Sequence, residues 1–150
     1  MKNLHLLPTD KPSRLYSNNG QLHLDSVLTT SNGHTINQNI YITSNEEISR
    51  DTKPCWCLDD KDNSVNYYQG ALPLHNYIGY KKIILTTDQD LIADGVQAID
   101  DEFLEWFVKN PSFEEISTKS YYKTWEDGVT FDRIEYDIII PKEEPKQQEQ

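Results

Sequence analysis

Short runs of β-branched and aromatic residues recur along this chain, and clusters of Asn, Asp, Ser, Gly and Pro separate them. Such runs are typical of strands, and the turn residues between them favour short connections. The runs at 55–59 and 65–68 are expected to form a hairpin, whereas residues 16–38 are expected to be loop around one short strand. The pattern predicts strands at 4–7, 22–25, 39–43, 55–59, 65–68, 81–87, 113–117 and 132–140.

One segment, residues 100–110, has the period of a longer helix. Asp100 is a suitable N-cap, and acidic residues follow it where the helix dipole favours anions. Phe103 and Phe107 lie one turn apart on the expected buried face, and Pro111 prevents continuation. The sequence therefore predicts one amphipathic helix that packs on the strands.

Upstream of this helix, a single helical turn is expected, capped by Thr87 or Asp88 and closed by Gly95. The alternative is one helix over 88–109, which places Gly95 in its interior at a cost of about 1 kcal/mol. Asp88 and Asp90 also form a D-x-D pattern after a strand, which can bind a divalent cation for phosphoryl transfer. We favour the capping role for Asp88 over the metal role.

Together these elements predict an α+β fold, mainly antiparallel, built as a small barrel or SH3-like sheet with the helix at 100–110 packed on it. The chain has 150 residues, which is the usual size of one domain. We expect a single domain over 1–140. Residues 141–150 are polar and contain two prolines, so we expect a disordered tail there.

The charge and the cysteines limit the class of protein. A net charge of -11 argues against binding the nucleic-acid backbone and favours a partner with a basic face. No apolar run approaches the roughly 20 residues that a membrane helix needs. The two cysteines, Cys55 and Cys57, are too close in sequence for a disulfide between them, which fits a reducing cytoplasm.

Four segments carry a resemblance to a known family. They resemble a family of small hypothetical proteins found in bacteroidete bacteria and their phages, which implies a bacterial or phage cytoplasmic setting and an accessory role. Relatives have a Gly-Asp-Trp turn soon after the EEI segment, whereas here Trp56 follows Pro54-Cys55 after a longer spacer, so the loop at 49–53 need not match. The matching segments are LHLLPTDKPSRL (4–15), NIYITSNEEI (39–48), KKIILTTDQDLIADGVQAIDDEFLEWFVKNPS (81–112) and IIIPKEEPKQ (138–147).

The other candidate sites are weaker. Residues 59–64 resemble a calcium loop, but the sixth position after Asp60 is Val65 and not Gly, so a hairpin turn is expected. No phosphate-binding glycine loop is present. The histidines lack the spacing of a metal site, and neither they nor the cysteines form a recognisable catalytic pair: His5, His23, His34 and His75. We therefore expect no cofactor and no metal.

The aromatic residues are the better candidates for function. Exposed Tyr and Trp make good recognition surfaces, although packing in the core is their more frequent role. An adjacent pair such as Tyr67 and Tyr68 places one ring on each face of a strand. The candidate partner-binding residues are Trp56, Tyr67, Tyr68, Tyr77, Tyr80, Tyr122 and Trp125.

These features predict a non-enzymatic cytoplasmic binding protein of phage or accessory type with an anti-defence role, alone or as a homo-oligomer. It would engage a host protein or sequester a small nucleotide-like ligand. The sequestering form predicts a concave pocket with basic residues drawn from Arg14, Arg50, Lys81, Lys82 and Arg133. The alternatives are a metal-dependent phosphodiesterase that uses Asp88 and Asp90, and a structural phage component with a large apolar interface.

Overall fold

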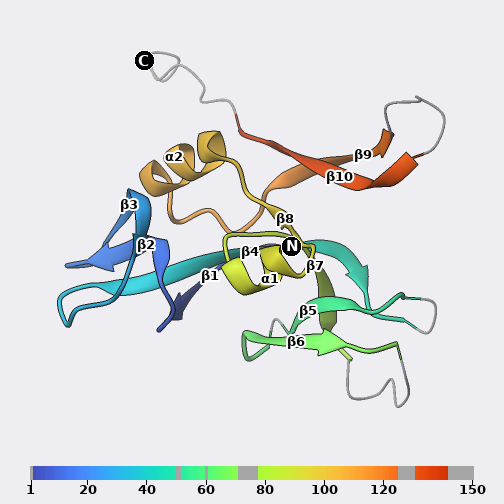
Figure 1. Cartoon of the computed structure of the whole chain (residues 1–150), viewed down its shortest axis with the longest axis horizontal. Helices are drawn as coiled ribbons and strands as arrows, with labels where there is room; N and C mark the ends of the chain where they lie inside the picture. Colours follow the sequence, from blue (N-terminus) through green and yellow to red (C-terminus); the bar gives the residue numbers. More distant parts are fainter. Residues whose placement is uncertain (1, 50–51, 60, 71–77, 125–130, 142–150) are drawn as a thin grey trace, which may run out of the picture. The chain divides into compact units, whose positions relative to one another are not determined.

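The computed structural model describes residues 2–49, 52–59, 61–70, 78–124 and 131–141. Contacts divide the chain into two compact units, Met1–Glu115 and Ile116–Gln150. The first unit contains an eight-stranded sheet and two short helices (Figure 1). Its elements are β1 (Leu4–Thr9), β2 (Ser13–Asn18), β3 (Gln21–Thr29), β4 (Ile36–Glu47), β5 (Cys55–Asp59), β6 (Ser64–Tyr68), β7 (Tyr80–Thr86), α1 (Gln89–Ala93), β8 (Gln97–Ala98) and α2 (Asp101–Lys109).

The long strand β4 is the spine of this sheet. Asn37 pairs with both β1 and β2, whereas Tyr41, farther along, pairs with both β1 and β7. A strand has two hydrogen-bonding edges, so β1 runs along one edge of β4, and β2 and β7 follow each other along the opposite edge. All pairings are antiparallel except the short parallel one between β7 and β8.

The sheet is not closed, so the predicted barrel or SH3-like closure is wrong, whereas the mainly antiparallel α+β class is confirmed. The strand order is β3-β2-β4-β7-β5-β6, with β1 beside β4 and β8 beside β7. Because β2 and β7 share one edge of β4, the β2–β3 and β5–β6 pairs extend from different ends of that strand. Among the described residues, β3 and β6 are not hydrogen-bonded to each other.

Helix α1 covers one face of the sheet. Alternation along β4 turns Tyr41 to this face and Ile40 and Ile42 to the other, and all three are buried. Leu91 of α1 packs against Tyr41 in a buried cluster, and further apolar side chains surround it. The buried members are Tyr41, Leu58, Ile83 and Leu91, and the partly buried ones are Leu7, Trp56, Val65 and Val96.

The caps of the two helices match the sequence prediction. Asp88 accepts a hydrogen bond from the Asp90 N–H at 3.0 Å, and Asp100 accepts one from the Phe103 N–H at 2.9 Å. Gly95 lies between the helices with a φ of +109°, a left-handed value that glycine adopts without strain. The chain therefore forms two separate helices, and the alternative of one continuous helix is wrong.

The predicted buried face of α2 is confirmed. Phe103 and Phe107 are buried with their ring centroids 5.7 Å apart, whereas Glu105 is exposed. The helix contacts β3, and it ends where the Asn110 side chain donates a hydrogen bond to the carbonyl of Trp106 at 2.9 Å. The helix dipole is balanced by acidic residues in its first turn and by Lys109 in its last.

Two strand predictions are wrong. Residues 13–18 form β2, although their polar composition favoured a loop. Residues 113–116 are not a strand: Phe113 packs on the Trp106 ring at 4.8 Å, and the Glu114 carbonyl accepts hydrogen bonds from the N–H groups of Asn3 and Leu4. In both segments the pairing partner lies elsewhere in the chain, so the local pattern did not determine the structure.

The second unit contains an antiparallel hairpin of β9 (Ser117–Thr124) and β10 (Phe131–Ile139). Ile134 pairs with Tyr122, and both side chains are largely exposed. Residues 142–150, on which the predicted tail falls, lie outside the described residues, as do the candidates Tyr77 and Trp125.

Candidate functional site

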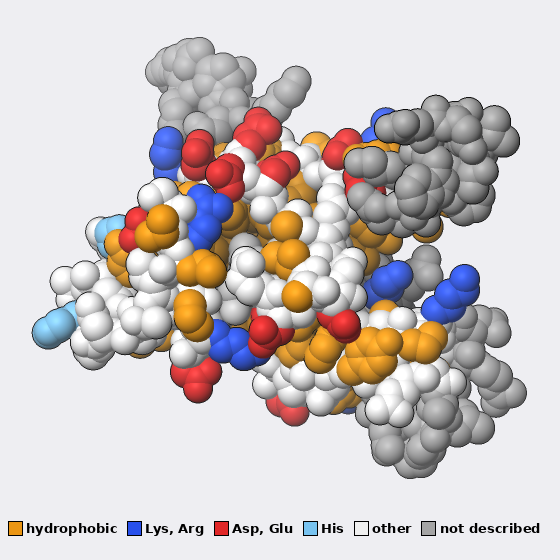
Figure 2. Space-filling view, viewed as in Figure 1, with side chains coloured by type: hydrophobic (Ala, Val, Ile, Leu, Met, Phe, Trp, Pro, Cys, Tyr) orange, Lys and Arg blue, Asp and Glu red, His pale blue; other side chains and the backbone are white. Residues whose placement is uncertain are grey.

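A groove of about 510 Å³ lies between the β1–β2 connection, the β5–β6 hairpin and the start of α1. In the space-filling view, hydrophobic side chains gather over β5 and β6, and acidic and basic side chains adjoin them (Figure 2). The described residues that line the groove are Leu7, Pro8, Thr9, Lys11, Tyr41, Trp56, Asn63, Val65, Asp88, Asp90 and Leu91.

The floor of the groove holds a buried hydrogen bond between β4 and α1. Tyr41 donates its hydroxyl proton to Oδ2 of Asp88 at 2.6 Å, and Asp88 is only 4% exposed. Burial and the neighbouring carboxylate raise the pKa of the Tyr41 phenol well above its usual value. Both carboxylate oxygens of Asp88 bind protein groups, since Oδ1 caps α1. The capping role that we favoured for Asp88 is therefore confirmed.

The rim of the groove carries an exposed ion pair. Lys11 Nζ lies 2.5 Å from Oδ2 of Asp90, which raises the pKa of the lysine, and the charges of Asp88 and Asp10 add to this effect. The side chains of Lys11 and Asp90 are 51% and 67% exposed. Among the described residues that line the groove, Lys11 is the one cation.

The aromatic side of the groove lies on the β5–β6 hairpin. Trp56 and Tyr67 are register partners on one face of the hairpin, with ring centroids 5.3 Å apart in an edge-on arrangement. The Trp56 indole N–H donates a hydrogen bond to Oδ2 of Asp94 at 2.7 Å. Trp56 is partly buried, and Tyr67 is 41% exposed. This joins a rigid aromatic pair to the carboxylates of the α1 segment.

The remaining sequence-predicted residues do not join this pair. Tyr68 is buried on the opposite face of the hairpin, and its hydroxyl donates to the Ser49 carbonyl at 3.4 Å. Tyr80 contacts Asn66 through its hydroxyl, which accepts from the Asn66 amide at 3.1 Å. Tyr122 belongs to the second unit and is 65% exposed. Of the seven candidates, the structure brings Trp56 and Tyr67 together.

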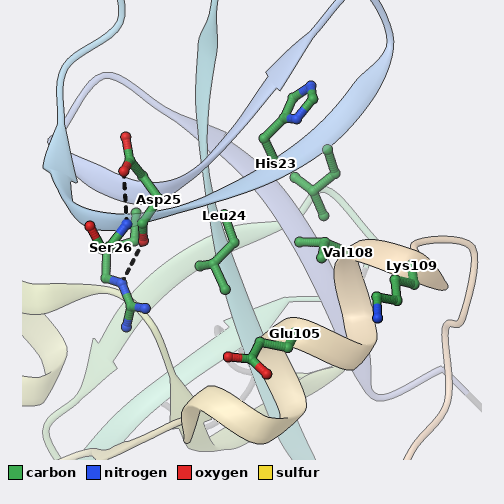
Figure 3. Close-up of a pocket in the computed structure, with 9 residues that line it drawn as sticks. His23, Leu24, Asp25, Ser26, Glu105, Val108 and Lys109 are labelled. Carbon is green, nitrogen blue, oxygen red and sulfur yellow. Dashed lines mark hydrogen bonds between the residues drawn. The ribbon is translucent and has the colours of Figure 1, made fainter.

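A second depression lies between β3 and α2 (Figure 3). Leu24 and Val108 reach into it, and Glu105 and Lys109 lie along the helix side. Arg14 is the basic residue that the ligand-sequestering form calls for, but its guanidinium donates to the Asp25 carbonyl and to the Asp101 carboxylate, each at 2.9 Å. The lining has no excess of positive charge to hold a phosphate group.

The thiols and the turn at 59–64 have structural explanations. Burial raises the pKa of the Cys57 thiol to about 12, so this side chain is protonated and a poor nucleophile at neutral pH. Burial likewise raises the pKa of Cys55, and both cysteines are free. In the turn, Asp62 accepts hydrogen bonds from the Ser64 N–H and hydroxyl at 3.0 and 2.7 Å, as in an ordinary hairpin turn.

Metal-ligating side chains do not converge in the described part of the chain: no three His, Cys, Asp or Glu side chains form a group that could hold an ion there. Asp90 forms the rim ion pair with Lys11, and Asp88 is the helix cap. The groove therefore offers carboxylates and aromatic rings for recognition and not a preformed ligand set.

Three groove residues were not predicted from the sequence: Lys11, Val65 and Asp94. Lys11 and Asp94 sit in polar turns, where a charged residue is ordinary, and no local pattern distinguishes them. The D-x-D pattern drew attention to Asp88 and Asp90, and the two-cysteine segment drew attention to Trp56. Only the pairing of β5 with β7 and the course of α1 bring these segments to one place.

Comparison of the chain with protein-family models, with curated proteins and with solved structures found no match in any of the three. Within the described residues, no helix has the length and hydropathy needed to cross a bilayer. The functional proposal therefore depends on the geometry of the groove.

Proposed function

We propose that this protein is a small non-enzymatic binding protein of the accessory type found in bacteria and their phages, and that it engages a host protein in the cytoplasm. The groove beside α1 is its recognition surface. The observation that carries the proposal is the rigid Trp56–Tyr67 pair bordered by the Asp90 and Asp94 carboxylates. Trp and Tyr dominate the energetics of protein interfaces because they bury a large area at a low entropy cost.

The charge of the groove favours a protein over a nucleotide-like ligand. Asp88 and Asp90 line it, and Asp94 adjoins it through Trp56. A phosphate group brought here meets these carboxylates, and the lysine of the groove already forms an ion pair with one of them. A basic protein surface gains from the same field, which also accelerates its association.

The experiment is capture of a host protein from bacterial lysate by the immobilised chain. We expect capture at low salt and its loss near 1 M salt, because the screening length falls from roughly 10 Å at 0.1 M to 3 Å at 1 M. Tyr67→Ala should reduce capture of that protein at least fivefold. Tyr121→Ala is the matched control, because Tyr67 and Tyr121 are both 41% exposed and only Tyr67 contacts Trp56.

Two results would contradict the proposal. Capture that Tyr67→Ala leaves intact and Tyr121→Ala abolishes would move the recognition surface to the β9–β10 hairpin. Turnover of a nucleotide or phosphodiester with Mg²⁺ or Mn²⁺, lost in Asp88→Asn, would replace the binding function with the phosphodiesterase alternative. For that variant, circular dichroism must first show that α1 remains folded, since Asp88 is its cap.

A further inference from the structure

The side chain of Lys11 reaches across the groove from an anchored backbone. Its carbonyl accepts a hydrogen bond from the buried Asn37 amide at 2.8 Å, and its N–H donates to the Thr9 hydroxyl at 3.1 Å. Its ammonium ends on Asp90, in the first turn of α1. The connection between β1 and β2 is therefore held in place, while the charged end of the lysine spans to another element.

The Lys11–Asp90 ion pair is open to exchange. Both side chains are at least half exposed, and an exposed pair of this kind contributes little net stability because water and salt screen it. The carboxylate could thus accept a different cation at small cost. In contrast, the Tyr41–Asp88 hydrogen bond beneath it is buried, so the floor of the groove would stay in place during such an exchange.

The groove has more negative charge than Lys11 neutralises. The carboxylates of Asp10, Asp88 and Asp90 all act on the Lys11 ammonium. One cation against three carboxylates leaves the local charge at about -2, before any contribution from Asp94 beside Trp56. The site is therefore complementary to added positive charge, and the adjoining Trp56 and Val65 are complementary to an apolar group.

We propose that Lys11 is an internal stand-in for a basic side chain of the protein partner. This inference rests on the proposed function and names the chemistry of the segment that is bound. A peptide segment places an arginine or lysine on Asp90 in exchange for Lys11, and sets a neighbouring apolar side chain against Trp56 and Val65. Arginine is the better occupant, because its planar guanidinium binds a carboxylate through two parallel hydrogen bonds. Lys11 thereby weakens binding until the partner displaces it.

The test uses two capped pentapeptides that differ only in charge, acetyl-ALRVA-amide and acetyl-ALQVA-amide. Binding to the full chain is followed by the NMR shift of the Trp56 indole N–H, assigned with Trp56→Phe. We expect the arginine peptide to shift this signal and the glutamine peptide to bind at least threefold more weakly. This readout measures weak binding and does not depend on the identity of the cellular partner.

Matched variants separate local exchange from overall charge. Lys11→Met removes the ammonium and keeps a side chain of similar length, and it should tighten arginine-peptide binding about three- to fivefold. Asp90→Asn should weaken it by a similar factor. Lys109→Met and Glu105→Gln make the same charge changes on α2, away from this groove, and should leave the affinity within about 1.5-fold of the parent.

Several outcomes would overturn the inference. Equal tightening by Lys11→Met and Lys109→Met would show an effect of net charge alone. Equal binding of the two peptides would show an apolar groove without a cation subsite. Displacement of the arginine peptide by millimolar Mg²⁺ would assign the carboxylates to a metal ion. Each of these leaves the proposed function standing if Tyr67→Ala still abolishes host-protein capture, whereas unchanged capture in that variant defeats the proposed function by itself.

Discussion

The hydroxyl of Tyr41 donates a hydrogen bond to Oδ2 of Asp88 at 2.6 Å, across 47 residues of sequence. Asp88 also receives the Asp90 N–H on its other oxygen, and its own N–H donates to the Thr86 hydroxyl at 3.0 Å. The end of β7, the start of α1 and the middle of β4 are thus joined at one buried carboxylate. This joint fixes the floor of the groove.

Tyr41→Phe should lower the free energy of unfolding by about 1–3 kcal/mol, because it leaves a buried carboxylate oxygen without its donor. Urea unfolding followed by circular dichroism measures the change. Tyr67→Phe removes the hydroxyl of a 41% exposed tyrosine and should change stability by no more than about 0.5 kcal/mol. Equal losses in the two variants would show that the Tyr41–Asp88 hydrogen bond contributes nothing specific.

Phe107→Ala should destabilise the protein by about 3–5 kcal/mol, because the ring is 1% exposed and stacks on Phe103. Glu105→Ala, on the exposed side of the same helix, should cost no more than about 0.5 kcal/mol. Chemical denaturation of the two variants side by side tests the orientation of α2. A large loss in Glu105→Ala with none in Phe107→Ala would reverse that orientation.

Stability should fall on the alkaline side, beginning near pH 9. The pKa values of Cys57, Tyr41 and Lys11 are raised in the folded chain, that of Cys57 from 9.0 to about 12. Above its ordinary pKa, each group loses its proton in the unfolded chain first, so unfolding becomes more favourable as the pH rises. Each such group contributes a slope of about 1.4 kcal/mol per pH unit within its window.

Urea unfolding of the reduced protein at pH 8, 9, 10 and 11 measures this decline. Cys57→Ala should remove the part that begins near pH 9, and Tyr41→Phe should remove the part above pH 10, because each variant lacks the titrating group. The prediction fails if the unfolding free energy of the parent chain is the same at pH 8 and pH 11.

A chain that ends at Pro141 should keep the melting temperature of the full chain. The nine residues after Pro141 are all polar apart from Pro145, so they have little apolar surface to offset the ordering entropy of roughly 1–2 kcal/mol per residue. Differential scanning calorimetry of the two chains measures the difference. A decrease of several degrees would show that these residues pack on the rest of the protein.

Much of the local structure follows from the sequence. The Asp100 cap, the buried Phe103–Phe107 face and the break at Gly95 are determined by residues within a few positions of each other, so their pattern predicts them. The β5–β6 hairpin is equally local, since its turn residues bring the two strands into register. Strand β2 was missed because its polar residues become a strand only when β3 and β4 lie on both sides of it.

The groove depended on contacts between distant segments. The Lys11–Asp90 ion pair joins residues 79 apart, and the Trp56–Asp94 hydrogen bond joins residues 38 apart. By itself, the sequence determined which residues favour helix, strand and turn and that the chain is acidic, because these properties depend on composition and near neighbours. Only the tertiary structure placed an aromatic pair beside carboxylates and left the sheet open. It did so through the register along β4, which is fixed by packing across the whole sheet and not by any one segment.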